Sequence, residues 1–234
     1  MCVRYTLHKT DAALLAIARA LARTLTTPAW VQPKFNVTLT HRMPVVAVGA
    51  DDVEVRGMAW GLVPFYERGK ARPQLLPNAK AETATTLPTF RDAVAHRRCL
   101  VPANGFYEWK TAGKTKLPHL FTLRDEAPFA LAGIWEPASG DGPETFGVLT
   151  TEPNALVAPI HDRMPVVLTE ETMAGWLGAE PLGAEVYRAL TRPLAAERMS
   201  VRPVSRFVNN SRNDGPQCLE PPEDGPPELE LNFT

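Results

Sequence analysis

The chain has 234 residues, of which 44% are hydrophobic and 22% are charged, so it is long enough for a sizeable core and one domain is the default. Its 25 basic residues nearly balance its 26 acidic ones, which excludes a highly charged disordered protein. The 23 prolines disfavour a helical bundle and favour short strands joined by turns.

Strands are predicted along most of the chain. Residues 2–7 form the first, and further strands are expected within 35–65 and at 99–102, 105–110, 117–123, 129–135, 146–151 and 199–205. Residues 11–25 have leucines at helical spacing, with Asp11 as a candidate cap. Further helices are predicted at 88–97, 153–158, 170–177 and 181–191, and an exposed loop at 66–77. We therefore expect a single α+β domain in which antiparallel strands dominate.

The end of the chain is acidic. Five acidic residues within the last fifteen positions have no basic partner there, which leaves 25 basic and 21 acidic residues in the rest of the chain. We therefore expect a domain over 1–220 with a modestly basic surface, and a loose proline-rich tail over 221–234.

Membrane, metal and cofactor signals are missing from the sequence. No apolar run approaches the roughly 18 residues of a membrane span. The three cysteines form no CxxC pair, so we expect reduced thiols in a cytoplasmic protein. His96 and Cys99 offer two ligand types, but no second pair stands at zinc spacing. We predict no metal and no cofactor.

Cys2 is the first candidate for chemistry. Methionine before a small residue is commonly removed, and Cys2 would then carry a free α-amine beside its thiol. The amine titrates near 8, so part of it is neutral and nucleophilic at physiological pH. Such an aminothiol forms an imine with an aldehyde and then closes to a thiazolidine. The alternatives are acyl transfer by the thiol alone and an incidental second residue.

Two other segments carry candidate acids and bases. Glu108 lies among Phe106, Tyr107 and Trp109, where desolvation would raise its pKa and suit it to proton transfer. An outward-facing carboxylate is the simpler interpretation of that strand. His161, beside Asp162 and between two prolines, suits a held acid or base, and a structural turn explains it equally well.

Four further residues are weaker candidates. Asn78 could orient a reacting group by hydrogen bonding, and Lys80 could contact a phosphate. The simpler interpretation is a turn asparagine followed by solvated charges. The aromatic residues Trp60 and Phe65 suit stacking on bases, although core packing is the commoner role.

Seven segments in order resemble the SOS response-associated peptidase (SRAP) family, the YedK/HMCES-like abasic site processing proteins. The segments are 1–4, 60–64, 78–82, 98–109, 132–136, 158–165 and 208–210. The resemblance implies one α+β domain around a curved, barrel-like antiparallel sheet flanked by short helices. Three positions depart from the family pattern: Val3 replaces a glycine, Lys80 an arginine and Leu39 a proline.

The resemblance also implies a function. The family senses abasic sites in single-stranded DNA, and its N-terminal cysteine forms a thiazolidine crosslink that shields the lesion during the SOS response. Its autoproteolytic activity exposes this cysteine, and here only Met1 would be removed. By motif, the catalytic residues are Cys2, Asn78, Glu108 and His161.

The implied DNA contacts lie in the same motifs. Arg4, Lys80 and Arg163 would contact phosphates, and Trp60 and Phe65 would lie near the bases. We expect a monomer, associated with the nucleoid through DNA. Two alternatives stay open: a cysteine peptidase or amidase that acts in trans, and a single-stranded DNA binder that uses no catalysis.

Overall fold

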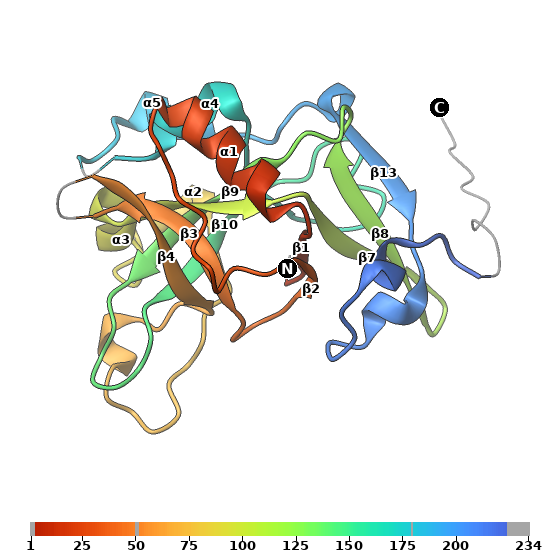
Figure 1. Ribbon diagram of the computed structural model, residues 1–234, viewed down its shortest axis with the longest axis horizontal. Coiled ribbons are helices and arrows are strands. Elements are labelled where there is room, and N and C mark those ends of the chain that lie inside the picture. The colour runs from red at the N-terminus through yellow and green to blue at the C-terminus, as the bar shows by residue number, and fades with distance from the viewer. Residues whose placement is uncertain (1–2, 50–51, 179, 224–234) are drawn as a thin grey trace.

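The computed structural model describes residues 3–49, 52–178 and 180–223, and its strands form two sheets (Figure 1). The smaller sheet has five strands. In sheet order they are β13 (Met199–Pro203), β8 (Thr115–Leu123), β7 (Gly105–Ala112), β1 (Tyr5–Leu7) and β2 (Lys34–Val37). All of its pairings in the described residues are antiparallel.

The larger sheet has eight strands in the described part of the chain. They are β3 (Arg42–Val48), β4 (Val53–Trp60), β5 (Asn78–Lys80), β6 (Arg98–Ala103), β9 (Phe129–Glu136), β10 (Thr145–Thr151), β11 (Met164–Pro165) and β12 (Val167–Leu168). β10 pairs with both β4 and β9, and β4, β3, β6 and β9 pair in turn, so these strands make a ring. β10 runs parallel to β4 and β5, and the other pairings are antiparallel. The expected curved α+β core is confirmed, although it is ring-like rather than a closed barrel.

Short helices cover one side of this ring, where Figure 1 shows α1, α4 and α5 together. The helices are α1 (Thr10–Leu21), α2 (Ala81–Ala84), α3 (Arg91–His96), α4 (Glu170–Trp176) and α5 (Ala184–Thr191). α1 packs its Leu14 and Ile17 against the buried side of β6 and β9, which is why its apolar residues recur at helical spacing. No helix in the described residues is long and apolar enough to cross a bilayer.

Two details of α1 differ from prediction. The helix ends at Leu21 because Ala22 takes a left-handed conformation, with φ of 50°, and its N–H bonds back to Ala18 and Arg19. Asp11 does not cap the helix, since its carboxylate accepts a hydrogen bond from Thr27. Asn104 instead accepts the N–H of Lys9, the residue before the helix, at 2.8 Å. This contact joins the start of α1 to the residue between β6 and β7, and no side chain caps the first turn of α1.

The predicted helix at 153–158 is wrong, because the chain forms turns there. The Asn154 side chain accepts hydrogen bonds from the N–H groups of Leu156 and Val157, each at 3.0 Å. Such an Asx-type turn satisfies the backbone locally, and Pro159 has no N–H to continue a helix.

β7 begins directly after β6, at Gly105. A Cβ atom at Gly105 would lie 2.8 Å from the Phe121 carbonyl oxygen, so only glycine lets β7 and β8 approach this closely. The strand predicted after Asn104 is confirmed, and the chain enters it through a bend at Asn104 rather than through a turn.

Arg98 joins α3 and α4 from inside the protein, where the residue is 2% exposed. Its guanidinium donates to five backbone carbonyls, those of Val94, Ala95, Trp176, Gly178 and Glu180. These include carbonyls at the ends of both helices, which have no partner within the helix.

Replacing Arg98 by Met should therefore strongly destabilise the protein. Each buried carbonyl left without a donor costs about 1–3 kcal/mol, so we expect a loss of at least about 3 kcal/mol in the free energy of unfolding. Urea unfolding measures it. Arg19→Met is the matched control, because the Arg19 side chain is 63% exposed, and it should stay within about 0.5 kcal/mol of the parent. Equal stability of the two variants would contradict the assignment.

Candidate active site

Glu108 is a buried carboxylate on the inner face of the smaller sheet. The residue is 3% exposed, so the simpler interpretation of an outward-facing side chain is wrong. Strand alternation puts its neighbours Tyr107 and Trp109 on the opposite face, where they pack against Val204 and Val208. Glu108 is thus buried by the fold rather than by its sequence neighbours.

His161 faces Glu108 from the segment after the turns at 155–160. Its Nε2 lies 3.8 Å from Oε2 of Glu108. Its Nδ1 accepts the backbone N–H of Arg163 at 3.0 Å. The Arg163 carbonyl oxygen also lies 3.0 Å from Nδ1, so Nδ1 has a backbone partner in either neutral tautomer.

The surroundings of Nδ1 also suit the charged ring. The Arg163 carbonyl oxygen lies 3.0 Å from Nδ1, and a carboxylate oxygen of Asp162 lies 3.2 Å from it. A protonated Nδ1 would donate to either acceptor. The His161 ring thus has hydrogen-bond partners in both protonation states, which suits a group that exchanges protons.

Asn78 is held in place by the strand order. It begins β5, opposite Val148 of β10. The carbonyl of the preceding residue, Pro77, accepts the Trp60 indole N–H at 3.1 Å and the Val148 N–H at 2.9 Å. The alternative of a turn asparagine is wrong, because Asn78 is a partly buried strand residue.

Lys80 and Arg163 lie on either side of the β10 residue Thr150. Lys80 is exposed and is opposite Thr150 in the register. Arg163 donates to the Thr150 carbonyl at 2.6 Å. Two of the three predicted phosphate-binding residues thus lie together at Thr150, and Arg163 is two residues beyond His161 in the chain.

The guanidinium of Arg163 is oriented by Glu82, a residue that sequence reasoning did not single out. It donates to both carboxylate oxygens of Glu82, at 2.9 and 2.8 Å. The hydrogen bond from Arg163 lowers the pKa of Glu82, so this carboxylate stays ionised at neutral pH. The motif at 78–82 contained the signal, since Glu82 is its only acidic residue.

Arg4 makes mainly internal contacts. Its guanidinium donates to Oδ1 of Asn36 and to the Val208 carbonyl, both at 2.8 Å, and lies 5.5 Å from the centre of the Trp109 ring. A phosphate contact by Arg4 stays a prediction. In the structure Arg4 joins β1 to the segment after β13.

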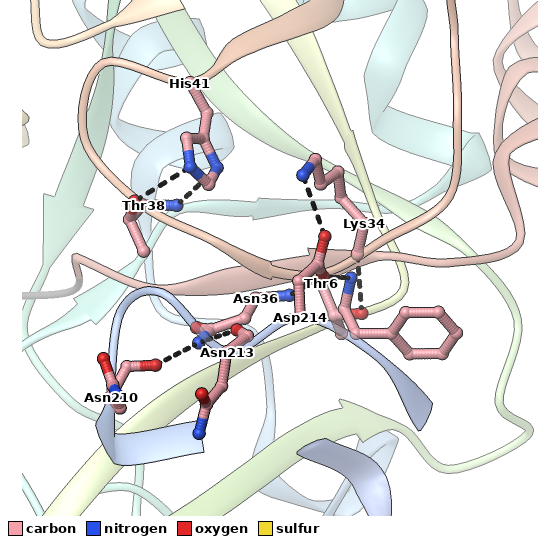
Figure 2. A network of polar contacts seen from close by, with 9 residues as sticks. Thr6, Lys34, Asn36, Thr38, His41, Asn210, Asn213 and Asp214 are labelled. Carbon is pink, nitrogen blue, oxygen red and sulfur yellow. Dashed lines mark hydrogen bonds and ion pairs between the residues drawn. The ribbon is translucent and has the colours of Figure 1, made fainter. Parts of the chain in front are cut away.

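Asn36 anchors that same segment, as the network in Figure 2 shows. Its side-chain amide donates to the carbonyls of Asn213 at 2.8 Å and Asn210 at 3.1 Å. Asp214 completes the contact by accepting the N–H groups of Phe35 and Asn36 and the ammonium of Lys34. The chain near 206–214 is therefore fixed against β2.

Trp60 and Phe65 lie in different environments. Trp60 is 1% exposed and packs with its ring 5.2 Å from that of Tyr5, so it belongs to the core and supports Pro77. Phe65 is 55% exposed, and the ring of the 47% exposed Tyr66 lies edge-on to it at 5.3 Å. Base contacts by either predicted residue stay predictions, and Tyr66 is a further exposed aromatic.

Cys2 lies outside the described residues. β1 runs antiparallel to β7, with Tyr5 opposite Phe106, and the Tyr107 N–H donates to the Arg4 carbonyl at 3.1 Å. This register, continued by two residues, sets Val3 opposite Glu108.

The other two cysteines, Cys99 and Cys218, are free and buried. Burial raises the pKa of the Cys99 thiol, so it is a poor nucleophile. Across the described ranges, no group of three or more His, Cys, Asp or Glu residues is arranged to hold a metal ion.

Comparison with known proteins identifies the family. The family model described as SOS response associated peptidase (SRAP) matches residues 1–211. The chain belongs to the SRAP family.

The SRAP relatives share most of their length with this chain. It is 33% identical to the abasic site processing protein YoqW of Bacillus subtilis over 192 residues, which are 80% of this chain and 86% of the relative. It is 29% identical to the abasic site processing protein YedK of Escherichia coli, over 94% of this chain and 100% of that protein. The crystal structure of a Bacteroides thetaiotaomicron protein superposes with a TM-score of 0.77 and 26% identity, over 94% of this chain and 99% of the other.

Proposed function

We propose that this SRAP protein captures abasic sites in single-stranded DNA through a covalent bond to Cys2, after removal of Met1. The names of its relatives YoqW and YedK support abasic-site processing. The observation that supports the chemistry is the buried Glu108 beside the partly buried His161, with Nε2 and Oε2 3.8 Å apart. Glu108 lies on β7, the strand that pairs with β1, and β1 begins three residues after Cys2.

The proposed reaction joins two nucleophiles of Cys2 to one carbon. The α-amine adds to the C1′ aldehyde of the ring-opened deoxyribose, and the resulting carbinolamine loses water to give an imine, a Schiff base. The thiol then adds to the imine carbon and the nitrogen takes up the thiol proton, which closes a thiazolidine ring. No oxidant or cofactor is consumed.

Each step moves a proton, and two residues are available for it. Expulsion of water needs a general acid, and ring closure needs a base that takes the thiol proton. In the proposal Glu108 transfers these protons, and His161 assists opening of the sugar ring and the reverse reaction. Asn78 orients the amine or the sugar by hydrogen bonding.

Intact mass spectrometry tests the proposal directly. The purified protein should lack Met1, and an oligonucleotide with one abasic site should add its mass minus one water. Acetylation of the α-amine should abolish this product. A protein that retains Met1 and still forms the adduct would overturn the proposal. A peptidase or amidase that acts in trans needs only the thiol. Hydrolysis of a peptide or amide substrate that survives acetylation of the α-amine would therefore favour that alternative.

Lys80 and Arg163 are proposed to contact DNA phosphates near the lesion. Each contact releases counterions, so Lys80→Ala and Arg163→Ala should each reduce the slope of log affinity against log salt by about 0.7 for a single strand. Fluorescence anisotropy from low to moderate salt measures the slope. Arg19→Ala, an exposed change on α1, is the control and should leave the slope unchanged. An unaltered slope in Lys80→Ala would remove Lys80 from the phosphate contacts.

A further inference from the structure

A cavity of about 430 Å³ lies on the same sheet face as Glu108. His119 of β8 is directly opposite Glu108 of β7, so both side chains project from one face. Lys110 is two residues beyond Glu108 and lines the cavity, as does Ile160, the residue before His161. Residues close in sequence to Glu108 and His161 therefore line the cavity, and its size is within the range of small-ligand sites.

His119 is one of the residues that line this cavity. The residue is 0% exposed, and its Nδ1 lies 3.0 Å from the Leu117 carbonyl, which can only accept a hydrogen bond. Nδ1 therefore carries the proton, and Nε2 is an acceptor. In the described residues this buried Nε2 has no hydrogen-bond partner. Burial lowers the pKa of His119, which keeps the ring neutral near pH 7.

The remaining walls combine apolar surfaces with a basic mouth. Leu156, Pro159, Ile160 and Val201 supply the apolar surface. The lining also includes two basic side chains, those of Lys110 and the exposed Arg124, and one carboxylate, that of Glu197. The charged part of the lining therefore carries a net positive charge. The Arg124 Nε donates to the Glu197 carbonyl at 2.7 Å, which orients the guanidinium.

We propose that this cavity is a subsite for the base of a nucleotide next to the abasic site. This inference rests on the function proposed above. Every natural base carries at least one N–H on its pairing edge, which His119 Nε2 would accept. The apolar walls suit the faces of a base, and Lys110 and Arg124 at the mouth suit the phosphate of the same nucleotide. An unpaired neighbour of a lesion is free to leave the stack at little cost.

The experiment removes the neighbouring bases one at a time. Binding is measured by anisotropy with single strands that hold tetrahydrofuran, a stable abasic analogue, at the centre, and with strands that also lack the base on the 5′ or the 3′ side. We expect removal on one side to weaken binding to the parent about ten-fold, the scale of one stacked base. His119→Leu should bind the intact strand about ten-fold more weakly and should be insensitive to that removal.

The controls separate this inference from the proposed function. His96→Leu, an exposed change at the end of α3, should keep the full sensitivity. The ¹⁵N signal of His119 Nε2 in the parent protein should move when the intact strand binds, which needs no variant. Equal affinity of the parent for all strands, or an unmoved signal that indicates a water-filled cavity, would overturn the subsite. If the parent protein forms no covalent adduct with an abasic strand, the proposed function is refuted instead.

Discussion

Replacing Cys2 by Ala should abolish covalent capture of an abasic strand and leave its noncovalent affinity within about two-fold of the parent. Alanine removes the sulfur, so any imine formed by the α-amine stays reversible and no thiazolidine closes. The phosphate contacts that supply affinity come from other residues. Denaturing gels measure the crosslink, and anisotropy with the tetrahydrofuran analogue measures binding.

The other two cysteines give matched controls for this variant. Cys99 and Cys218 are buried and free, so Cys99→Ala and Cys218→Ala should crosslink as the parent does, at temperatures where both are folded. Stable crosslinking by Cys2→Ala would contradict the assignment of Cys2 as the nucleophile. Loss of crosslinking in folded Cys218→Ala would contradict it as well.

Replacing Glu108 by Gln should slow crosslinking by at least about 100-fold, the usual contribution of one general acid or base. Glutamine keeps the size of the side chain, but it transfers no proton. Affinity for the tetrahydrofuran analogue should not change. Single-turnover rates of crosslink formation, measured at one pH for the parent and the variant, show the effect.

An exposed carboxylate provides the control. Glu171 pairs with Arg198 on the surface, and Glu171→Gln should crosslink at the parental rate. A Glu108→Gln rate within two-fold of the parent would leave His161 as the proton-transfer group. Weaker binding at an unchanged rate would make Glu108 a binding residue instead.

Strands with apolar runs were predicted closely. The expected strands at 105–110, 117–123 and 129–135 correspond to β7, β8 and β9, because the fold buries most of their apolar residues. The prediction failed at 153–158, where the Asn154 side chain replaces helical hydrogen bonds. Apolar periodicity over six residues does not distinguish a helix from such a turn.

The sequence by itself determined the family, the strand-rich class and the identity of the candidate residues, since ordered motifs and alternation are properties of the chain. Tertiary structure alone decided what each candidate contacts. It turned Glu108 inward toward His161, buried Trp60 in the core and joined Arg4 to Val208, 204 positions away. Strand pairing sets such distant contacts. A one-residue change of register would reverse the faces of every side chain on a strand while the sequence stayed the same.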